Sequence, residues 1–172
     1  MNELKNMVRN IPDFPSPGVM FRDITTVLKD PKGLILAMDA LADLLKGVEF
    51  DLVLGPESRG FIFGVPMAYK MNKGFVPARK VGKLPAETAR IAYALEYGQA
   101  EIEVHVDAIK PGDRVVIVDD LLATGGTAKA TADLMVQLGA EVVCLAFLIE
   151  LEQLGGREAL KDYKNVKSVL VY

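Results

Sequence analysis

The segment from Val115 to Thr127 constrains the fold of this chain more than any other part of its sequence. It begins with Val115–Val118, an unbroken run of β-branched residues that is apolar on both faces, as in a central strand of a parallel sheet. Two carboxylates, Asp119 and Asp120, soon follow, and the small residues 123–127 then lead toward a helix. The segment therefore predicts a buried strand, a tight loop and a helix in direct succession.

The loop in this segment is suited to an anion. Residues without bulk let backbone N–H groups approach a phosphate closely at a helix N-terminus. The two acids would lie at the carboxyl edge of the sheet, where they can accept hydrogen bonds from sugar hydroxyls. The segment lacks the Gly-Lys-Ser/Thr of a P-loop and the third spaced glycine of a dinucleotide motif. The alternative is an ordinary polar turn, which the acids placed before the two glycines disfavour.

Strands and helices alternate along the rest of the chain. Strands are expected at 52–54, 75–79, 101–106, 115–118 and 142–149, and helices at about 34–45, at about 61–70 and before Gly139. This alternation predicts an α/β fold in which helices flank a central, mostly parallel sheet. The length fits a single domain over residues 1–172. The strand at 101–106 alternates in polarity, so one face, which carries His105, should be wet, and the proline-rich range 11–18 should be irregular.

Three further segments carry candidate functional groups. Glu57, Ser58 and Arg59 lie in a second strand-to-helix loop, which is a reasonable cradle for pyrophosphate, although such loops are also common turns. A basic cluster, Arg79, Lys80 and Lys83, opens the range 80–98, which shows no clean period and could form a flexible lid or a merely solvated loop. Glu96, near the end of that range, could move a proton on a heterocycle or be an ordinary surface acid.

Composition excludes several classes of function. A net charge of −3 and a pI near 5.3 disfavour general binding to nucleic acid or to a membrane surface. The single cysteine, Cys144, cannot form an internal disulfide or a zinc site. The chain starts without an apolar signal region, and no segment resembles a membrane span, so we expect a soluble, cytoplasmic protein.

These motifs together resemble one known family. The segments that carry the resemblance are Asp13–Ile24, Glu57–Phe61, Arg79–Lys80 with Gly82–Pro85, Leu95–Gly98, Asp119–Thr127 and Leu154–Arg157. In this order they resemble the adenine phosphoribosyltransferases, a branch of the type I phosphoribosyltransferase family. The phosphate motif marks only the wider family, whereas Phe21–Ile24 and Leu95–Gly98 point to the adenine branch.

The resemblance implies a reaction and a fold. It implies transfer of the 5-phosphoribosyl group from 5-phosphoribosyl-1-pyrophosphate (PRPP) to adenine, giving AMP and pyrophosphate in purine salvage. It implies a type I phosphoribosyltransferase fold with an N-terminal hood at residues 1–32, a lid at 80–98 and assembly as a homodimer. Another base, such as hypoxanthine, guanine, xanthine or orotate, is the nearest alternative. A PRPP-binding regulator is a second, but it would need an added DNA-binding domain or a basic face.

The resemblance also implies roles for single residues. PRPP would be bound by Glu57, Ser58, Arg59, Arg79, Lys80, Lys83, Asp119, Asp120, Ala123, Thr124, Gly125, Gly126 and Thr127, with a non-proline cis peptide between the first two. Adenine would be bound by Met20, Phe21 and Arg22, through backbone contacts and apolar stacking, and by Tyr97, and Glu96 and Arg59 would be catalytic. Mg²⁺ would be held by PRPP and by water near the two aspartates, without direct protein ligands.

Overall fold

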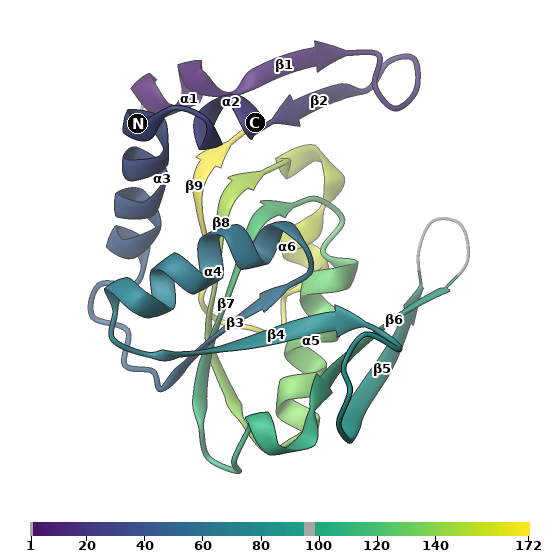
Figure 1. Cartoon of the computed structure of the whole chain (residues 1–172). Coiled ribbons are helices and arrows are strands. Elements are labelled where there is room, and N and C mark those ends of the chain that lie inside the picture. The colour runs from purple at the N-terminus through teal and green to yellow at the C-terminus, as the bar shows by residue number, and fades with distance from the viewer. Residues whose placement is uncertain (1, 95–98) are drawn as a thin grey trace.

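The computed structural model describes residues 2–94 and 99–172, which form a seven-stranded sheet, a two-stranded hairpin and helices (Figure 1). The strand order in the large sheet is β5-β6-β4-β3-β7-β8-β9. Its strands are β3 (Leu52–Pro56), β4 (Gly74–Lys80), β5 (Thr88–Ala94), β6 (Gln99–His105), β7 (Arg114–Leu122), β8 (Glu141–Glu150) and β9 (Val166–Val171). Strands β4, β3, β7, β8 and β9 run parallel, and β6 pairs antiparallel with both β4 and β5 at one end of the sheet. The predicted α/β fold with a mostly parallel sheet is confirmed.

Helices cover both faces of this sheet. The helices are α1 (Asn2–Met7), α2 (Thr25–Leu28), α3 (Pro31–Leu44), α4 (Arg59–Lys70), α5 (Gly126–Gln137) and α6 (Gly156–Ala159), with 3₁₀ turns at Val106–Ala108 and Glu152–Leu154. The α3 helix begins after Asp30, whose carboxylate accepts hydrogen bonds from the backbone N–H groups of Lys32 and Gly33 at 2.8 and 3.1 Å. Its predicted position, like that of α4, agrees with the structure to within a few residues.

Strand β7 lies at the centre of the core. Val116 and Val118 pack into the hydrophobic cluster that includes residues of α3 and α4. Val115 and Ile117 pack into the second cluster, which includes residues of α5. Successive residues of a strand point to opposite faces, so this run of β-branched residues supplies both cores at once. The sheet is therefore buried on both sides, as the apolar run predicts.

Two ranges expected to be irregular contain strands. Ile11 and Pro12 end strand β1 (Arg9–Pro12), which pairs antiparallel with β2 (Met20–Asp23). Proline can occupy the end of such a short hairpin strand because it donates no ladder hydrogen bond there. Within the predicted lid, 80–98, strand β5 pairs with β6 from Thr88 to Ala94. Its alternation of side chains is weak in the sequence because alanines occupy positions on both faces.

The prediction of a wet face on β6 is wrong for Glu103. This side chain is only 3 % exposed. Its carboxylate accepts hydrogen bonds from the backbone N–H groups of Lys83 and Leu84, both at 3.1 Å, and from Thr88 Oγ1 at 3.1 Å. The turn between β4 and β5 folds over this strand and supplies donors to the acid in place of water. His105, on the same face, is half-buried, and its Nε2 accepts a hydrogen bond from the Ala86 N–H at 3.3 Å.

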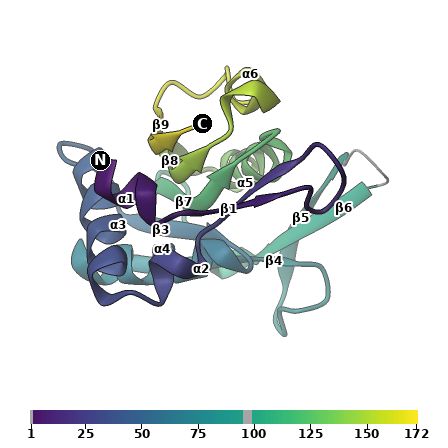
Figure 2. The same cartoon turned by 90° about the horizontal axis from the view of Figure 1, so that it is seen from above.

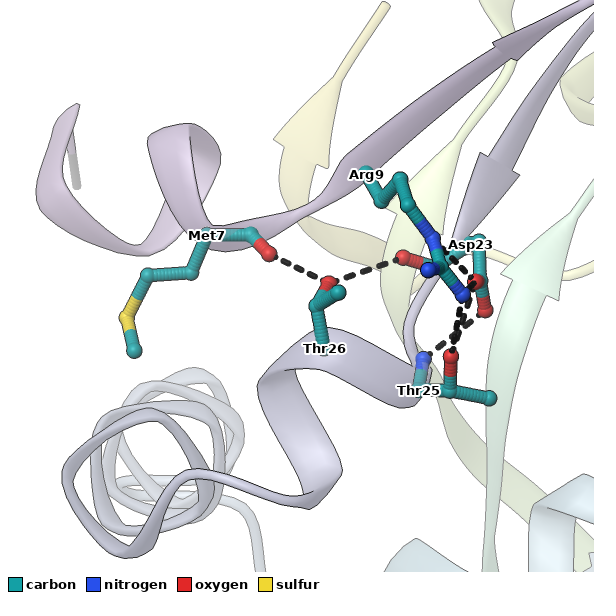
Figure 3. Close-up of polar contacts among 5 residues, drawn as sticks. All are labelled: Met7, Arg9, Asp23, Thr25 and Thr26. Carbon is teal, nitrogen blue, oxygen red and sulfur yellow. Dashed lines mark hydrogen bonds and ion pairs between the residues drawn. The ribbon is translucent and has the colours of Figure 1, made fainter.

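The β1–β2 hairpin forms a hood above the carboxyl ends of the parallel strands (Figures 1 and 2). Asp23 anchors its base, as Figure 3 shows. The Asp23 carboxylate accepts hydrogen bonds from the Thr25 N–H at 2.9 Å and from Arg9 Nε at 2.9 Å. Thr26 Oγ1 donates to the Met7 carbonyl at 2.6 Å, which ties α2 to α1. The hydrogen bond from the Thr25 backbone is the main cause that lowers the pKa of Asp23 from 3.8 to about 2.

This anchor predicts a pH-dependent stability. Because the folded pKa of Asp23 is lowered, the ionised acid stabilises the fold above pH 4, and this contribution is lost as the pH falls toward 2. Asp23→Asn should therefore lower the free energy of unfolding by about 2 kcal/mol at neutral pH. Urea unfolding from pH 7 to pH 2 would measure the free energy of unfolding of the wild type and of Asp23→Asn. The difference between the two should shrink below pH 4. Glu3→Gln, an exposed control, should follow the wild-type profile, and a constant gap down to pH 2 would contradict the anchor.

Candidate active site

A cavity of about 240 Å³ opens at the carboxyl ends of β3 and β7. It is lined by Glu57–Arg59, at the start of α4, and by residues 119–128, which run from β7 into α5. The two strands are parallel neighbours in the sheet, paired from Leu52 to Leu54. The topology therefore brings the two loops that the sequence marks as anion-binding into one cavity.

The loop before α5 presents a helix N-terminus to this cavity. Gly125 is the N-cap of α5, has a positive φ of 84° and offers no side chain to cap the helix. Only glycine adopts this backbone conformation without strain. The first N–H groups of a helix lack intrahelical acceptors and carry partial positive charge. The loop thus provides donors for an anionic group such as a phosphate.

Asp119 and Asp120 lie against the same cavity, inside β7 rather than after it, since this strand continues to Leu122. Burial is the main cause that raises the pKa of Asp119 well above its usual range, and the neighbouring Asp120 charge adds to it. Burial also raises the pKa of Asp120, although Arg59 Nε lies 2.9 Å from its Oδ2 atom and opposes the shift. A second positive centre or a set of hydroxyl donors would stabilise this acid pair in its ionised form.

The Glu57–Ser58 peptide bond is cis, as the resemblance implies. The Glu57 carboxylate lies between two cations, with Arg79 Nε at 3.0 Å and Lys83 Nζ at 2.6 Å. Burial would raise the pKa of Glu57, but the hydrogen bonds from Lys83 and Arg79 outweigh it and lower the pKa below its usual range. Arg79 and Lys83, two residues of the predicted basic cluster, are thus held beside the cavity by an acid that lines it.

A turn near the C-terminal end of the chain supports the phosphate loop from behind. A Cβ atom on Gly156 would lie 2.4 Å from the carbonyl oxygen of Ala123, so the two backbones are in close contact. The next residue, Arg157, forms a bidentate ion pair with the buried Glu150 at 2.7 and 2.8 Å. This contact gives a structural reason for Leu154–Arg157, a motif that the sequence links to the family without a role. From the other side, Thr127 Oγ1 donates to the Tyr93 hydroxyl of β5 at 3.2 Å.

The remaining predicted residues lie elsewhere. Lys80 lines a separate hollow with Val81 and 99–101 and does not line the cavity. Met20, Phe21 and Arg22 form β2 of the hood, with Met20 exposed. Glu96 and Tyr97 lie outside the described residues, so their roles stay predictions.

Sequence reasoning missed some of the residues around the site. Leu121, Leu122 and Ala128 also line the cavity. The apolar side of β5 indicates that Tyr93 faces inward. No sequence signal predicts the contact between Tyr93 and Thr127. Strand pairing and helix packing, rather than a local motif, bring these residues to the site.

Two kinds of feature are absent from the described residues. Within 2–94 and 99–172, no three His, Cys, Asp or Glu side chains gather closely enough to hold a metal ion by themselves. Among the helices of these residues, none has the length and apolar character needed to span a bilayer.

Comparisons with known proteins agree with this geometry. A family profile described as the phosphoribosyl transferase domain matches residues 23–171. The adenine phosphoribosyltransferase of Lachnoclostridium phytofermentans is 57 % identical over 172 residues, covering 100 % of this chain and 98 % of the relative. The crystal structure of adenine phosphoribosyltransferase from Thermoanaerobacter pseudethanolicus superposes with a TM-score of 0.96 at 52 % identity, covering 99 % of each chain.

A second solved structure extends the comparison to a liganded enzyme. Adenine phosphoribosyltransferase from Saccharomyces cerevisiae, in complex with an imino-altritol bisphosphate and adenine, has a TM-score of 0.91 at 39 % identity, over 98 % of this chain and 97 % of that one. The relatives share high sequence identity with this chain over nearly its whole length, and both the family profile and the fold match as well. The chain belongs to the phosphoribosyltransferase family, in its adenine phosphoribosyltransferase branch.

Proposed function

We propose that this chain transfers the 5-phosphoribosyl group of PRPP to adenine, giving AMP and pyrophosphate in purine salvage. The observation that carries the proposal is the shared cavity, in which an uncapped helix N-terminus and a pair of carboxylates face the same space. A sugar phosphate needs both, because its phosphate requires N–H donors and its hydroxyls require acceptors. The choice of adenine as the acceptor base is supported by the relatives named above, which are adenine phosphoribosyltransferases.

Residues 123–127 would hold the 5′-phosphate through backbone donors, and Asp119 and Asp120 would accept hydrogen bonds from the ribose hydroxyls. Cleavage of the bond between the anomeric carbon and pyrophosphate leaves positive charge on the sugar ring. The carboxylate pair stabilises that charge by electrostatic attraction, and it does so most strongly where water is excluded. Attack by a purine nitrogen from the opposite face then inverts the anomeric carbon, and Glu96 would accept the proton that this nitrogen loses.

Arg59, Arg79 and Lys83 would stabilise the departing pyrophosphate, whose negative charge grows as the bond breaks. Lys80, which faces another hollow, is left out of this step. Glu57 keeps the other two side chains near the cavity through the ion pairs described above. Glu96 and Tyr97 are proposed, from the resemblance alone, to lie by the purine.

The carboxylate oxygens of Asp119 and Asp120 are of the type that Mg²⁺ prefers, and two acids are too few for a protein-only site. They fit an ion that takes most of its ligands from pyrophosphate and water. When bound, Mg²⁺ would neutralise part of the pyrophosphate charge.

We also propose that the chain is a cytoplasmic homodimer. Ile62, Val65 and Tyr69 are exposed at spacings of three and four residues on α4, and Tyr69 is 88 % exposed. Such a stripe on one helix face is suited to contact with a second copy.

One assay tests the proposed reaction. Purified protein with PRPP and Mg²⁺ should form AMP and pyrophosphate from adenine, and kcat/KM should be lower by at least a hundredfold with hypoxanthine, guanine, xanthine or orotate. Comparable turnover of another base would move the chain to another branch of the family. PRPP binding without turnover of any base would favour the regulator.

A further inference from the structure

Tyr172 follows β9 and lies below the hood, where Figure 1 marks the C-terminal end. Its backbone is bonded on both sides to the neighbouring segment. The Tyr172 N–H donates to the Glu150 carbonyl at 2.9 Å, and the Glu152 N–H donates to the Tyr172 carbonyl at 3.0 Å. The aromatic ring is therefore attached to the main sheet rather than to the hood.

The ring of Tyr172 receives a cation from the hood. The guanidinium carbon of Arg22 lies 4.2 Å from the ring centroid, within the range of a cation–π contact. One guanidinium nitrogen of Arg22 donates to Asn10 Oδ1, while the buried Nε atom has no hydrogen-bond partner among the described residues. An arginine is weakly hydrated and stacks well on an aromatic face, so the ring compensates the unpaired nitrogen. The side chain of Arg22 is thus committed to Tyr172 and Asn10.

This commitment fixes the strand that carries the proposed base-binding residues. Arg22 is the third residue of β2, and Met20 and Phe21 precede it in the same strand. A strand whose side chain is held by the main sheet cannot lift away without breaking that contact. We propose that Tyr172 is a positioning residue for adenine, because its ring holds Arg22 and so sets the height of β2 over the sheet. The proposal rests on the proposed function.

The same ring offers a matched control. Lys5 Nζ lies 4.5 Å from the Tyr172 centroid and donates to the Val171 carbonyl at 2.9 Å. Lys5 is part of α1, outside the β1–β2 hairpin. Removal of this cation changes the ring's surroundings but leaves the contact with β2 intact.

The test compares three variants by steady-state kinetics with adenine and PRPP varied separately. Tyr172→Leu, which removes the ring, should raise the KM for adenine roughly three- to tenfold and leave the KM for PRPP within twofold. Tyr172→Phe keeps the ring and loses only a 3.4 Å hydrogen bond from the hydroxyl to the Lys5 carbonyl, so it should behave as wild type. Lys5→Met should also leave both KM values within twofold.

Arg22→Met supplies a second arm, because it removes the other partner of the same contact. It should raise the KM for adenine as Tyr172→Leu does, and the double variant should be no worse than either single one, since both remove the same contact. Additive effects, an equal rise of both KM values, or a Tyr172→Phe defect equal to that of Tyr172→Leu would overturn the proposal. If Tyr172→Leu does not fold, an Arg22→Met enzyme with unchanged KM for adenine would overturn it alone. Inactivity of the wild-type protein would instead refute the proposed function.

Discussion

Replacement of both Asp119 and Asp120 by asparagine should weaken PRPP binding by a hundredfold or more while the protein stays at least as stable as the wild type. Hydrogen bonds to a charged acceptor contribute about 1.5–3 kcal/mol each, so two of them account for a hundredfold change or more in affinity. Titration calorimetry with PRPP and Mg²⁺ would measure the affinity. Thermal unfolding of the same samples would measure the stability.

The stability half of this prediction follows from the direction of the pKa shifts. Both carboxyls have raised pKa values because burial penalises their ionised forms. The folded state therefore binds protons more tightly than the unfolded one, and stability falls as the pH rises through the folded pKa values. An amide removes this penalty, and the lost pair with the half-exposed Arg59 costs little in return. The melting temperature should be unchanged or higher.

A control separates this effect from a general loss of an acid. Asp133→Asn replaces an acid on α5 that pairs with Lys129 and Tyr163 and does not line the cavity. This variant should lose some stability and keep the wild-type affinity for PRPP. Wild-type affinity in the Asp119→Asn/Asp120→Asn variant would contradict the ribose role, and a drop in its melting temperature would contradict the electrostatic argument.

Gly156→Ala should raise the KM for PRPP at least tenfold. The added Cβ atom would lie 2.4 Å from the Ala123 carbonyl oxygen and 2.7 Å from Leu122 Cδ1. Forced contacts of this kind cost about 1–3 kcal/mol and are relieved by backbone shifts. The backbone that must shift belongs to the phosphate loop. Gly156→Ala should therefore weaken PRPP binding and leave adenine binding unchanged.

The neighbouring glycine is the matched control for this prediction. Gly155 has a φ of 69°, and a Cβ atom there would have no atom within 4 Å. Gly155→Ala therefore introduces backbone strain of about 1–2 kcal/mol without a clash against the loop. Both variants should melt at lower temperature, but only Gly156→Ala should change the KM for PRPP. Equal KM values in the two variants would show that the turn does not shape the loop.

The sequence predicts the central strand, the phosphate loop and the start of α5 because their signals are local. A β-branched run, adjacent acids and paired glycines determine a strand, its edge and a helix N-terminus within a dozen residues. The second loop at Glu57–Arg59 is predicted for the same reason. Parallel pairing of β3 with β7 then brings the two loops together, as the alternation of elements indicates.

The parts that could not be predicted depend on contacts between distant segments. The alternating polarity of its strand predicts that Glu103 faces solvent. In the structure, the turn at 83–88 covers this side chain. Strand β5 is defined by its pairing with β6, which a weak local pattern does not reveal. The ring of Tyr172 meets Arg22 across 150 positions of sequence, and no local rule links them.

The ion pairs of Glu57 have a consequence for product release. This acid acts as an internal counter-ion shared by Arg79 and Lys83, so part of their positive charge is balanced within the protein. Fewer dissolved ions are then displaced, so affinity should depend less steeply on ionic strength than two bare cations would require. Because the same carboxylate can pair again with both side chains when pyrophosphate leaves, these ion pairs should favour product release.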